Sequence, residues 1–176
     1  LATLQVDHLQ PLFVRQRSSA TSFGQQIFTS VMHRLLVIDD SPTNRYGPKV
    51  KGADVHHNPT PGPANQSFLY GHLWVTISLT LRHPEWGALA LPLRAMLYVR
   101  KKTMATIPKS RGWQRFATKL QLAARLVEWI VPLLKKVEKT VWIVVDGGYT
   151  KRPFLQRALK TGVVVVGRLR KDAALR

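Results

Sequence analysis

Two continuous apolar runs near the carboxyl end of the chain constrain its fold more than any other feature. Residues 141–145 read VWIVV and residues 163–166 read VVVV, and such runs are typical of strands that are buried on both faces. The segment between them, TKRPFLQRALK, predicts a short helix with Thr150 as its cap and Gly162 as its stop. A strand, a helix and a strand in this order predict a right-handed parallel crossover.

The segments upstream of this crossover predict antiparallel strands. Residues 34–40, RLLVIDD, form a short apolar run that ends in two carboxylates, as expected for a buried strand. Residues 72–82 alternate between apolar and polar side chains and include several β-branched residues, so they predict a strand. Residues 88–100 follow as their antiparallel partner, with Pro92 near an edge or a bulge. The chain is therefore predicted to be an α/β protein with a mixed sheet. Its first three strands are antiparallel, and its later strands are parallel with crossover helices.

The segments between these strands predict two loops and one main helix. Residues 41–66 hold most of the Pro, Gly and Asn and predict a long loop that could include a short hairpin, and residues 101–113 predict a basic loop. Apolar residues at helical spacing predict a helix over residues 114–130. Pro132 should end or kink that helix, with a short helix beyond it to about Glu138.

The charge of the chain is strongly positive and unevenly distributed. Its 27 Lys and Arg exceed its 9 Asp and Glu by 18, and residues 100–176 hold 19 basic and 4 acidic residues. Such a field favours a polyanion such as DNA as partner, bound in a salt-dependent way. The absence of Cys excludes disulfides and thiolate zinc sites and fits a reducing cytosol. No apolar run is long enough to span a membrane, and no signal-peptide pattern opens the chain.

Two of the few carboxylates follow apolar, strand-like runs. Asp39, with Asp40 next to it, ends LLVID, and Asp146 ends WIVVD. If the two strands are parallel neighbours, both carboxylates emerge at the carboxyl edge, where open α/β sheets place their ligands. Close carboxylates repel each other, and a divalent cation removes that cost; oxygen-only ligands favour Mg²⁺ or Mn²⁺, which serve phosphodiester chemistry. The alternative is that Asp39 and Asp146 merely cap loops or helices.

Five segments in order resemble the cut-and-paste insertion-sequence transposases of the DDE superfamily. They are VIDDSPTNRYGPKVKGADVHHNP, YGHLWVTISLTL, ALPLRAMLYVRKK, VVDGGYTKRPFL and VVVVGRLRKDAAL, which together cover roughly residues 31–176. The resemblance implies an RNase H-like catalytic core that cleaves DNA and transfers strands with Mg²⁺ or Mn²⁺. It also implies a bacterial cytoplasmic, nucleoid-associated protein that works on transposon ends and target DNA, as a homodimer on that DNA.

The resemblance also implies roles for individual residues. The first catalytic Asp and metal ligand is Asp39, with Asp40 as the alternative by a slip of one residue, and the second is Asp146. Arg168, Arg170 and Lys171 resemble the family's basic stretch and are expected to contact DNA. Apart from the resemblance, Lys151 and Arg152 open the helix after Asp146, where with the helix N-terminus they could bind phosphate; the equal alternative is a solvated face.

The chain departs from the family pattern at its third carboxylate. The family needs a Glu on a later helix, whereas Asp172 lies in the tail, and Glu128 and Glu138 precede Asp146. We therefore interpret residues 1–30 as an N-terminal remnant and residues 31–176 as a partial catalytic domain that lacks its C-terminal part. Such a fragment should be inactive or weakly active alone, and the alternative is a non-catalytic basic nucleic-acid-binding protein.

His56 and His57 form a pair in the long predicted loop. They could contact phosphate or assist proton transfer, but structural hydrogen bonding is the favoured interpretation. The five Trp residues are interpreted as core or junction side chains rather than as base-stacking platforms.

Overall fold

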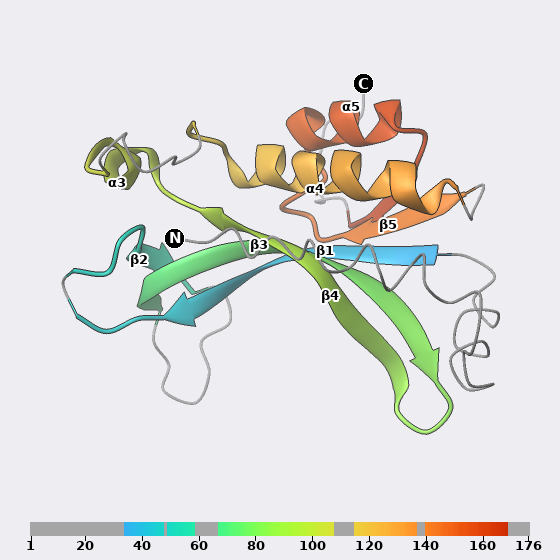
Figure 1. Ribbon diagram of the computed structural model, residues 1–176, viewed down its shortest axis with the longest axis horizontal. Helices are drawn as coiled ribbons and strands as arrows, with labels where there is room; N and C mark the ends of the chain where they lie inside the picture. Colours follow the sequence, from blue (N-terminus) through green and yellow to red (C-terminus); the bar gives the residue numbers. More distant parts are fainter. Residues whose placement is uncertain (1–33, 48, 59–66, 108–114, 137–139, 169–176) are drawn as a thin grey trace, which may run out of the picture.

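The computed structural model describes residues 34–47, 49–58, 67–107, 115–136 and 140–168. Within these residues a six-stranded mixed sheet has the order β2-β3-β1-β5-β6, and β4 also pairs with β3. The helices lie over one face of this sheet (Figure 1). The predicted mixed α/β architecture is confirmed, and its strand order is compatible with an RNase H-like fold.

The elements follow one another along the chain in the order that the sequence predicts, with two additions. The added elements are β2 and α3, each of which lies in a segment that was expected to be a loop. The bounds are β1 Arg34–Asn44, β2 Asp54–His57, β3 Phe68–His83, β4 Gly87–Tyr98, α3 Lys101–Ala105, α4 Lys119–Leu134, β5 Val141–Val145, α5 Arg152–Lys160 and β6 Val164–Gly167.

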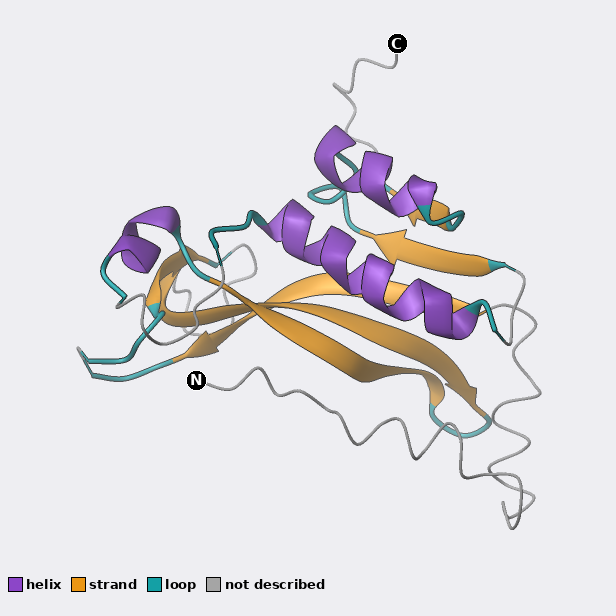
Figure 2. Cartoon of the chain, turned by 45° about the horizontal axis from the view of Figure 1, so that its top comes forward, coloured by secondary structure: helices purple, strands orange, loops and turns teal. Residues whose placement is uncertain are grey.

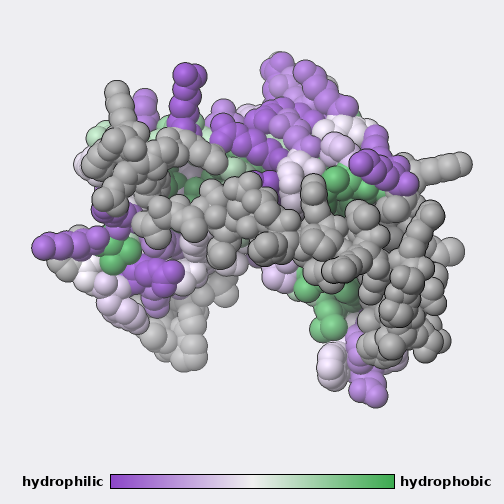
Figure 3. Space-filling view, viewed as in Figure 1, coloured by the Kyte–Doolittle hydropathy of each residue, from purple (hydrophilic) through white to green (hydrophobic). Residues whose placement is uncertain are grey.

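The long strand β3 organises the antiparallel half of the sheet. β1 pairs with one side of it, while β2 and β4 pair end to end with the other. The prediction for Pro92 is confirmed, because β4 pairs only with β3 and its register shifts opposite Ile77 and Ser78, beside Pro92. The end of the β3–β4 hairpin projects from the body (Figure 1), and Figure 3 shows hydrophobic surface on this arm, where Leu89 and Leu91 are exposed.

The β3 strand also explains where the structure departs from two sequence predictions. The first strand does not end at Asp39, because β1 continues to Asn44 along β3. Residues 41–66 were predicted as a long loop that could include a short hairpin; the strand in them, β2, pairs with the start of β3. Both segments are polar and lack an apolar run, so only the unpaired hydrogen-bonding groups of the 16-residue partner strand make them extended.

The parallel half of the sheet is the predicted crossover. β5 lies beside β1, β6 lies beside β5, and α5 connects the last two strands on the helical face (Figure 2). Gly162 follows the C-cap of α5 with a φ of 73°, so its predicted role as the stop is confirmed. Thr150 is not the cap. That position belongs to Lys151, and the Thr150 hydroxyl donates instead to the carbonyls of Gly147 and Arg168, at 3.1 and 3.0 Å.

Helix α4 covers the sheet and closes the core. It begins later than predicted, at Lys119, where Thr118 and Gln121 form a reciprocal capping box. Its buried side chains pack against those of β1, β3, β5 and α5: Leu122, Ala123, Ala124, Leu126, Val127, Ile130, Val131 and Leu134.

Pro132 does not end α4, so the predicted end is wrong, whereas the alternative of a kink stays a prediction. The helix continues to Leu134, since Pro132 and Glu128 are both exposed and the carbonyl that loses its partner can be hydrated. The neighbouring Val131 and Leu134 are buried and hold this last turn on the sheet. The predicted segment around Glu138 lies outside the described residues.

None of the described helices has the length and apolar character needed to cross a lipid bilayer.

Candidate functional site

Three carboxylates gather where β1 and β5 part. The two strands are parallel neighbours as far as the pair Ile38 and Val145; Asp39 is the next residue of β1, and Asp146 directly follows the end of β5. The predicted adjacency of the two strands is therefore confirmed, whereas metal sharing by their carboxylates stays a prediction.

Asp39 and Asp40 occupy opposite faces of β1, because successive side chains of a strand alternate. Asp40 has the same parity as the buried Leu36 and Ile38, and it therefore lies on the face covered by α4. Asp39 is exposed on the other face, where its Oδ1 accepts a hydrogen bond of 2.8 Å from the Asp40 backbone N–H.

Asp40 is held by two side chains from the helical layer. The Tyr149 hydroxyl donates to Oδ1 at 2.9 Å, and the Lys119 ammonium donates to Oδ2 at 2.6 Å. Lys119 is the first residue of α4, so the Thr118 capping box fixes the backbone from which this ammonium extends. The half-buried carboxylate therefore has a direct counter-charge.

Asp146 is oriented by the turn that follows it. Its Oδ1 accepts from the backbone N–H groups of Gly148, at 3.0 Å, and of Tyr149, at 3.2 Å. A Cβ at Gly148 would lie 3.2 Å from that same oxygen, so the absence of a side chain there suits the turn. Tyr149 consequently links the two strands, with its N–H on Asp146 and its hydroxyl on Asp40.

The environment of Tyr149 places all three carboxylates near its ring. The side chain is 2% exposed. Its pKa is raised well above the ordinary value, first by burial, then by the charge and hydrogen bond of Asp40, and then by the charges of Asp146 and Asp39. The phenol therefore stays protonated and remains a donor to Asp40.

The donor set fits a hard divalent cation in part. It consists of carboxylate oxygens, and Lys119 is the described cation in direct contact with it. Within the described residues, however, no three His, Cys, Asp or Glu side chains are arranged as a complete metal site. Glu128 does not supply the missing ligand, because it forms a two-pronged ion pair with Arg157, at 2.8 and 2.6 Å. Glu138 and Asp172 lie outside the described residues.

The predicted DNA-contacting residues flank this site where they are described. Lys151 and Arg152 are exposed at the start of α5, five and six positions after Asp146, and Arg168 is exposed directly after β6. Arg170 and Lys171 lie outside the described residues.

Sequence reasoning missed Lys119 and the role of Tyr149. The signal for Tyr149 was its fixed place in DGGY, three residues after Asp146. Lys119 had no comparable signal, because its approach to Asp40 spans 79 positions of the chain.

The two histidines do not act as a pair. His56 is buried and His57 is exposed against Phe68, because they alternate on β2. Burial is the main cause that lowers the pKa of His56; the positive charges of Arg100 and Lys119 lower it further, while Asp54 opposes them. His56 is therefore a neutral interior side chain at neutral pH.

Comparison with known proteins agrees with this geometry. The sequence profile of a family described as DDE superfamily endonuclease matches residues 2–176. No curated protein and no solved structure matches the chain. Endonucleases of this superfamily act on DNA and generally use divalent metal ions. Because the match extends over nearly the whole sequence, the chain belongs to the DDE superfamily endonuclease family.

Proposed function

We propose that this chain is the catalytic core of an insertion-sequence transposase, which cleaves DNA and transfers strands when the full-length protein is assembled on DNA. The observation that carries the proposal is the register of β1 and β5. The last paired residues are Ile38 and Val145, so Asp39 and Asp146 follow them at the same edge of the sheet. The proposal includes residues 31–176 as the catalytic domain, a homodimer on paired DNA ends and a place in the bacterial nucleoid.

Asp146 and an aspartate of β1 would hold Mg²⁺ or Mn²⁺. Register supports Asp39, as the sequence predicts; the shared contact with Tyr149 supports Asp40. When bound, the cation supplies activation of a water or of a DNA 3′ hydroxyl and stabilises the leaving oxygen.

The side chains around the acids have roles of their own. Tyr149 holds Asp40 and Asp146 in fixed orientations, and Lys119 balances the charge of Asp40 while no other cation is present. Lys151 and Arg152 would bind the DNA backbone beside the site, since the N-terminus of α5 adds its own attraction for phosphate.

Nicking of supercoiled plasmid DNA tests the proposal. We expect slow nicking that requires Mn²⁺ or Mg²⁺ and that falls to the metal-free level in Asp146→Asn. Asp39→Asn and Asp40→Asn then identify the β1 ligand, since only the variant that lacks it should lose nicking. Glu85→Gln, a matched loss of one carboxylate in the exposed β3–β4 turn, should behave like the parent.

A second candidate function is non-catalytic binding of nucleic acid. The incomplete ligand set among the described residues favours it. Salt-dependent DNA binding, with no metal-dependent nicking by the parent chain, would establish this second function instead of the first.

A further inference from the structure

The short helix α3 carries a run of positive charge. Arg100, its N-cap, is followed by Lys101 and Lys102, and the helix has no acidic residue in its first turn. None of the residues of α3 is buried, and its cap residue makes no side-chain hydrogen bond to it. Apolar packing therefore holds the two flanks of the helix, at the buried Val99 and Ile107, and leaves its own five residues to polar contacts.

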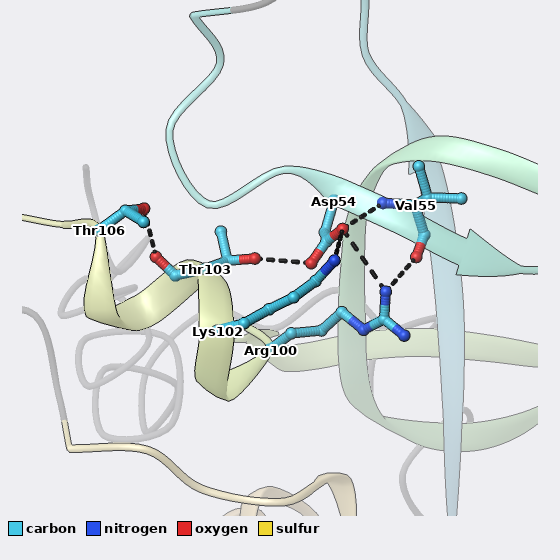
Figure 4. Close-up of polar contacts among 6 residues, drawn as sticks. All are labelled: Asp54, Val55, Arg100, Lys102, Thr103 and Thr106. Atoms are coloured by element: carbon cyan, nitrogen blue, oxygen red, sulfur yellow. Dashed lines mark hydrogen bonds and ion pairs between the residues drawn. The ribbon is translucent and has the colours of Figure 1, made fainter.

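Asp54, the first residue of β2, holds α3 through such contacts (Figure 4). Its carboxylate is 9% exposed, and it accepts hydrogen bonds from the Thr103 hydroxyl at 2.6 Å and the Val55 N–H at 2.7 Å. The Arg100 guanidinium and the Lys102 ammonium each lie 3.5 Å from Oδ1. Arg100 also donates to the Val55 carbonyl, at 3.0 Å.

These contacts keep Asp54 ionised. Burial alone would raise its pKa, but the hydrogen bonds from Thr103 and Val55, together with Lys102 and Arg100, outweigh burial and lower the pKa. Burying the carboxylate that fixes this five-residue helix costs desolvation free energy. Its effect is to fix the direction of side chains that stay largely in solvent, since those of Arg100 and Lys102 remain 44% and 70% exposed.

The position of α3 relates it to the acidic site. Figures 1 and 2 both place α3 beyond the N-terminal end of α4, on the helical side of the sheet. The positive charges of Arg100 and Lys119 both lower the pKa of the buried His56, so the α3 cluster and the Lys119–Asp40 pair lie within electrostatic reach of the same ring. The basic side chains of α3 therefore flank the acidic site, as Lys151 and Arg152 do at the start of α5.

We propose that α3 is a second phosphate-binding element, which grips the DNA backbone on the side of the acidic site opposite α5, with Asp54 as its anchor. This inference rests on the proposed action on DNA. Three cations against one carboxylate leave a positive surface, and cations on both sides of an acidic cluster suit a polyanion that passes over it. The acidic site itself repels phosphate, so flanking contacts of this kind are needed to hold DNA there.

Binding of a short fluorescent DNA duplex in EDTA, measured by anisotropy across a salt series, tests the inference without requiring catalysis. Each lost phosphate contact lowers the slope of log affinity against log salt by about 0.9. Lys101→Ala/Lys102→Ala should therefore lower the slope by about 2 and weaken binding on the order of tenfold or more near 0.1 M salt. Lys135→Ala/Lys160→Ala, a matched loss of two charges at the far ends of α4 and α5, should retain most of the parent's slope.

The role of Asp54 as the anchor is tested by a substitution for which two effects, charge and loss of the anchor, predict opposite changes in DNA affinity. Asp54→Ala removes a negative charge, so charge alone predicts tighter DNA binding, whereas loss of the anchor predicts weaker binding. Thr103→Val breaks the 2.6 Å hydrogen bond without changing any charge, and it should also weaken binding. Thermal melting of each variant shows that the loss does not come from unfolding.

The outcomes separate this inference from the proposed function. If the parent binds DNA but the α3 and distal double variants lose the same slope, α3 is not a phosphate-binding element. If Asp54→Ala binds more tightly and Thr103→Val binds like the parent, Asp54 is not its anchor. If the parent shows no salt-dependent DNA binding at all, both the proposed function and this inference are wrong.

Discussion

Asp146 shows how a carboxylate can follow a buried strand at a low desolvation cost. Two backbone N–H groups satisfy one of its oxygens, and the side chain stays exposed. An amide at this position could accept the same two hydrogen bonds through its own Oδ1. The negative charge is therefore dispensable for the turn, and its use must lie elsewhere.

Replacing Asp146 with Asn should therefore raise the thermal midpoint in the absence of metal, or at least not lower it, because it relieves repulsion from Asp39 and Asp40. Mn²⁺ should raise the midpoint of the parent, since a ligand that binds only the folded state stabilises it by about 2.7 kcal/mol at about 100 times the dissociation constant. We expect less from a partial ligand set. The same addition should do little to Asp146→Asn, and differential scanning fluorimetry measures both effects. Strong destabilisation of the variant, together with no metal effect on either protein, would make Asp146 a structural cap.

The sequence located the candidate acids but not their orientation. Apolar runs that end in Asp mark Asp39 and Asp146 correctly as neighbours on adjacent strands. The choice between Asp39 and Asp40 depends on which face α4 covers, and a shift of one residue reverses that face. The ties to Lys119 and Tyr149 span 79 and 109 positions, so no local pattern contains them.

At the scale of elements, the contact between β2 and α3 should depend on pH. The folded-state pKa of Asp54 is lowered, so its stabilising contribution is present above the unfolded pKa of about 3.9 and is lost as the pH falls through the folded value. Asp54→Asn should therefore melt below the parent at neutral pH, and the gap should shrink below about pH 4. Melting curves across an acid series measure this gap, and a gap that is constant with pH would contradict an ionised anchor.

Elements with an internal apolar pattern were predictable, and those that depend on a partner were not. The β3–β4 hairpin, α4 and the β5–α5–β6 crossover carry periodic or continuous apolar residues. The polar strand β2 is extended because its backbone forms hydrogen bonds with that of β3. Helix α3 is fixed by Asp54, which lies 49 positions upstream of Thr103. Pro132 was expected to end or kink α4 from its own chemistry alone, whereas the buried Val131 and Leu134 beside it hold the last turn on the sheet.

For the whole molecule, the excess of 18 positive charges should make stability respond to polyanions. Duplex DNA should raise the thermal midpoint at low salt, and the increase should fade between about 50 and 200 mM salt, because counterion release drives the binding. Thermal melts with duplex DNA, and with uncharged dextran as the control, measure this. An increase that is the same at every salt concentration, or that dextran reproduces, would argue against phosphate contacts as its source.

The long-range pairing of β1 with β5 also has a consequence for synthesis of the protein. The Tyr149 hydroxyl meets Asp40 across 109 positions of the chain. A ribosome must therefore translate most of the sequence before the two halves of the acidic cluster can meet. An interrupted translation product that ends before β5 carries the β1 aspartates without Asp146. The acidic cluster therefore assembles only after β5 has been synthesised, and chain connectivity alone sets that order.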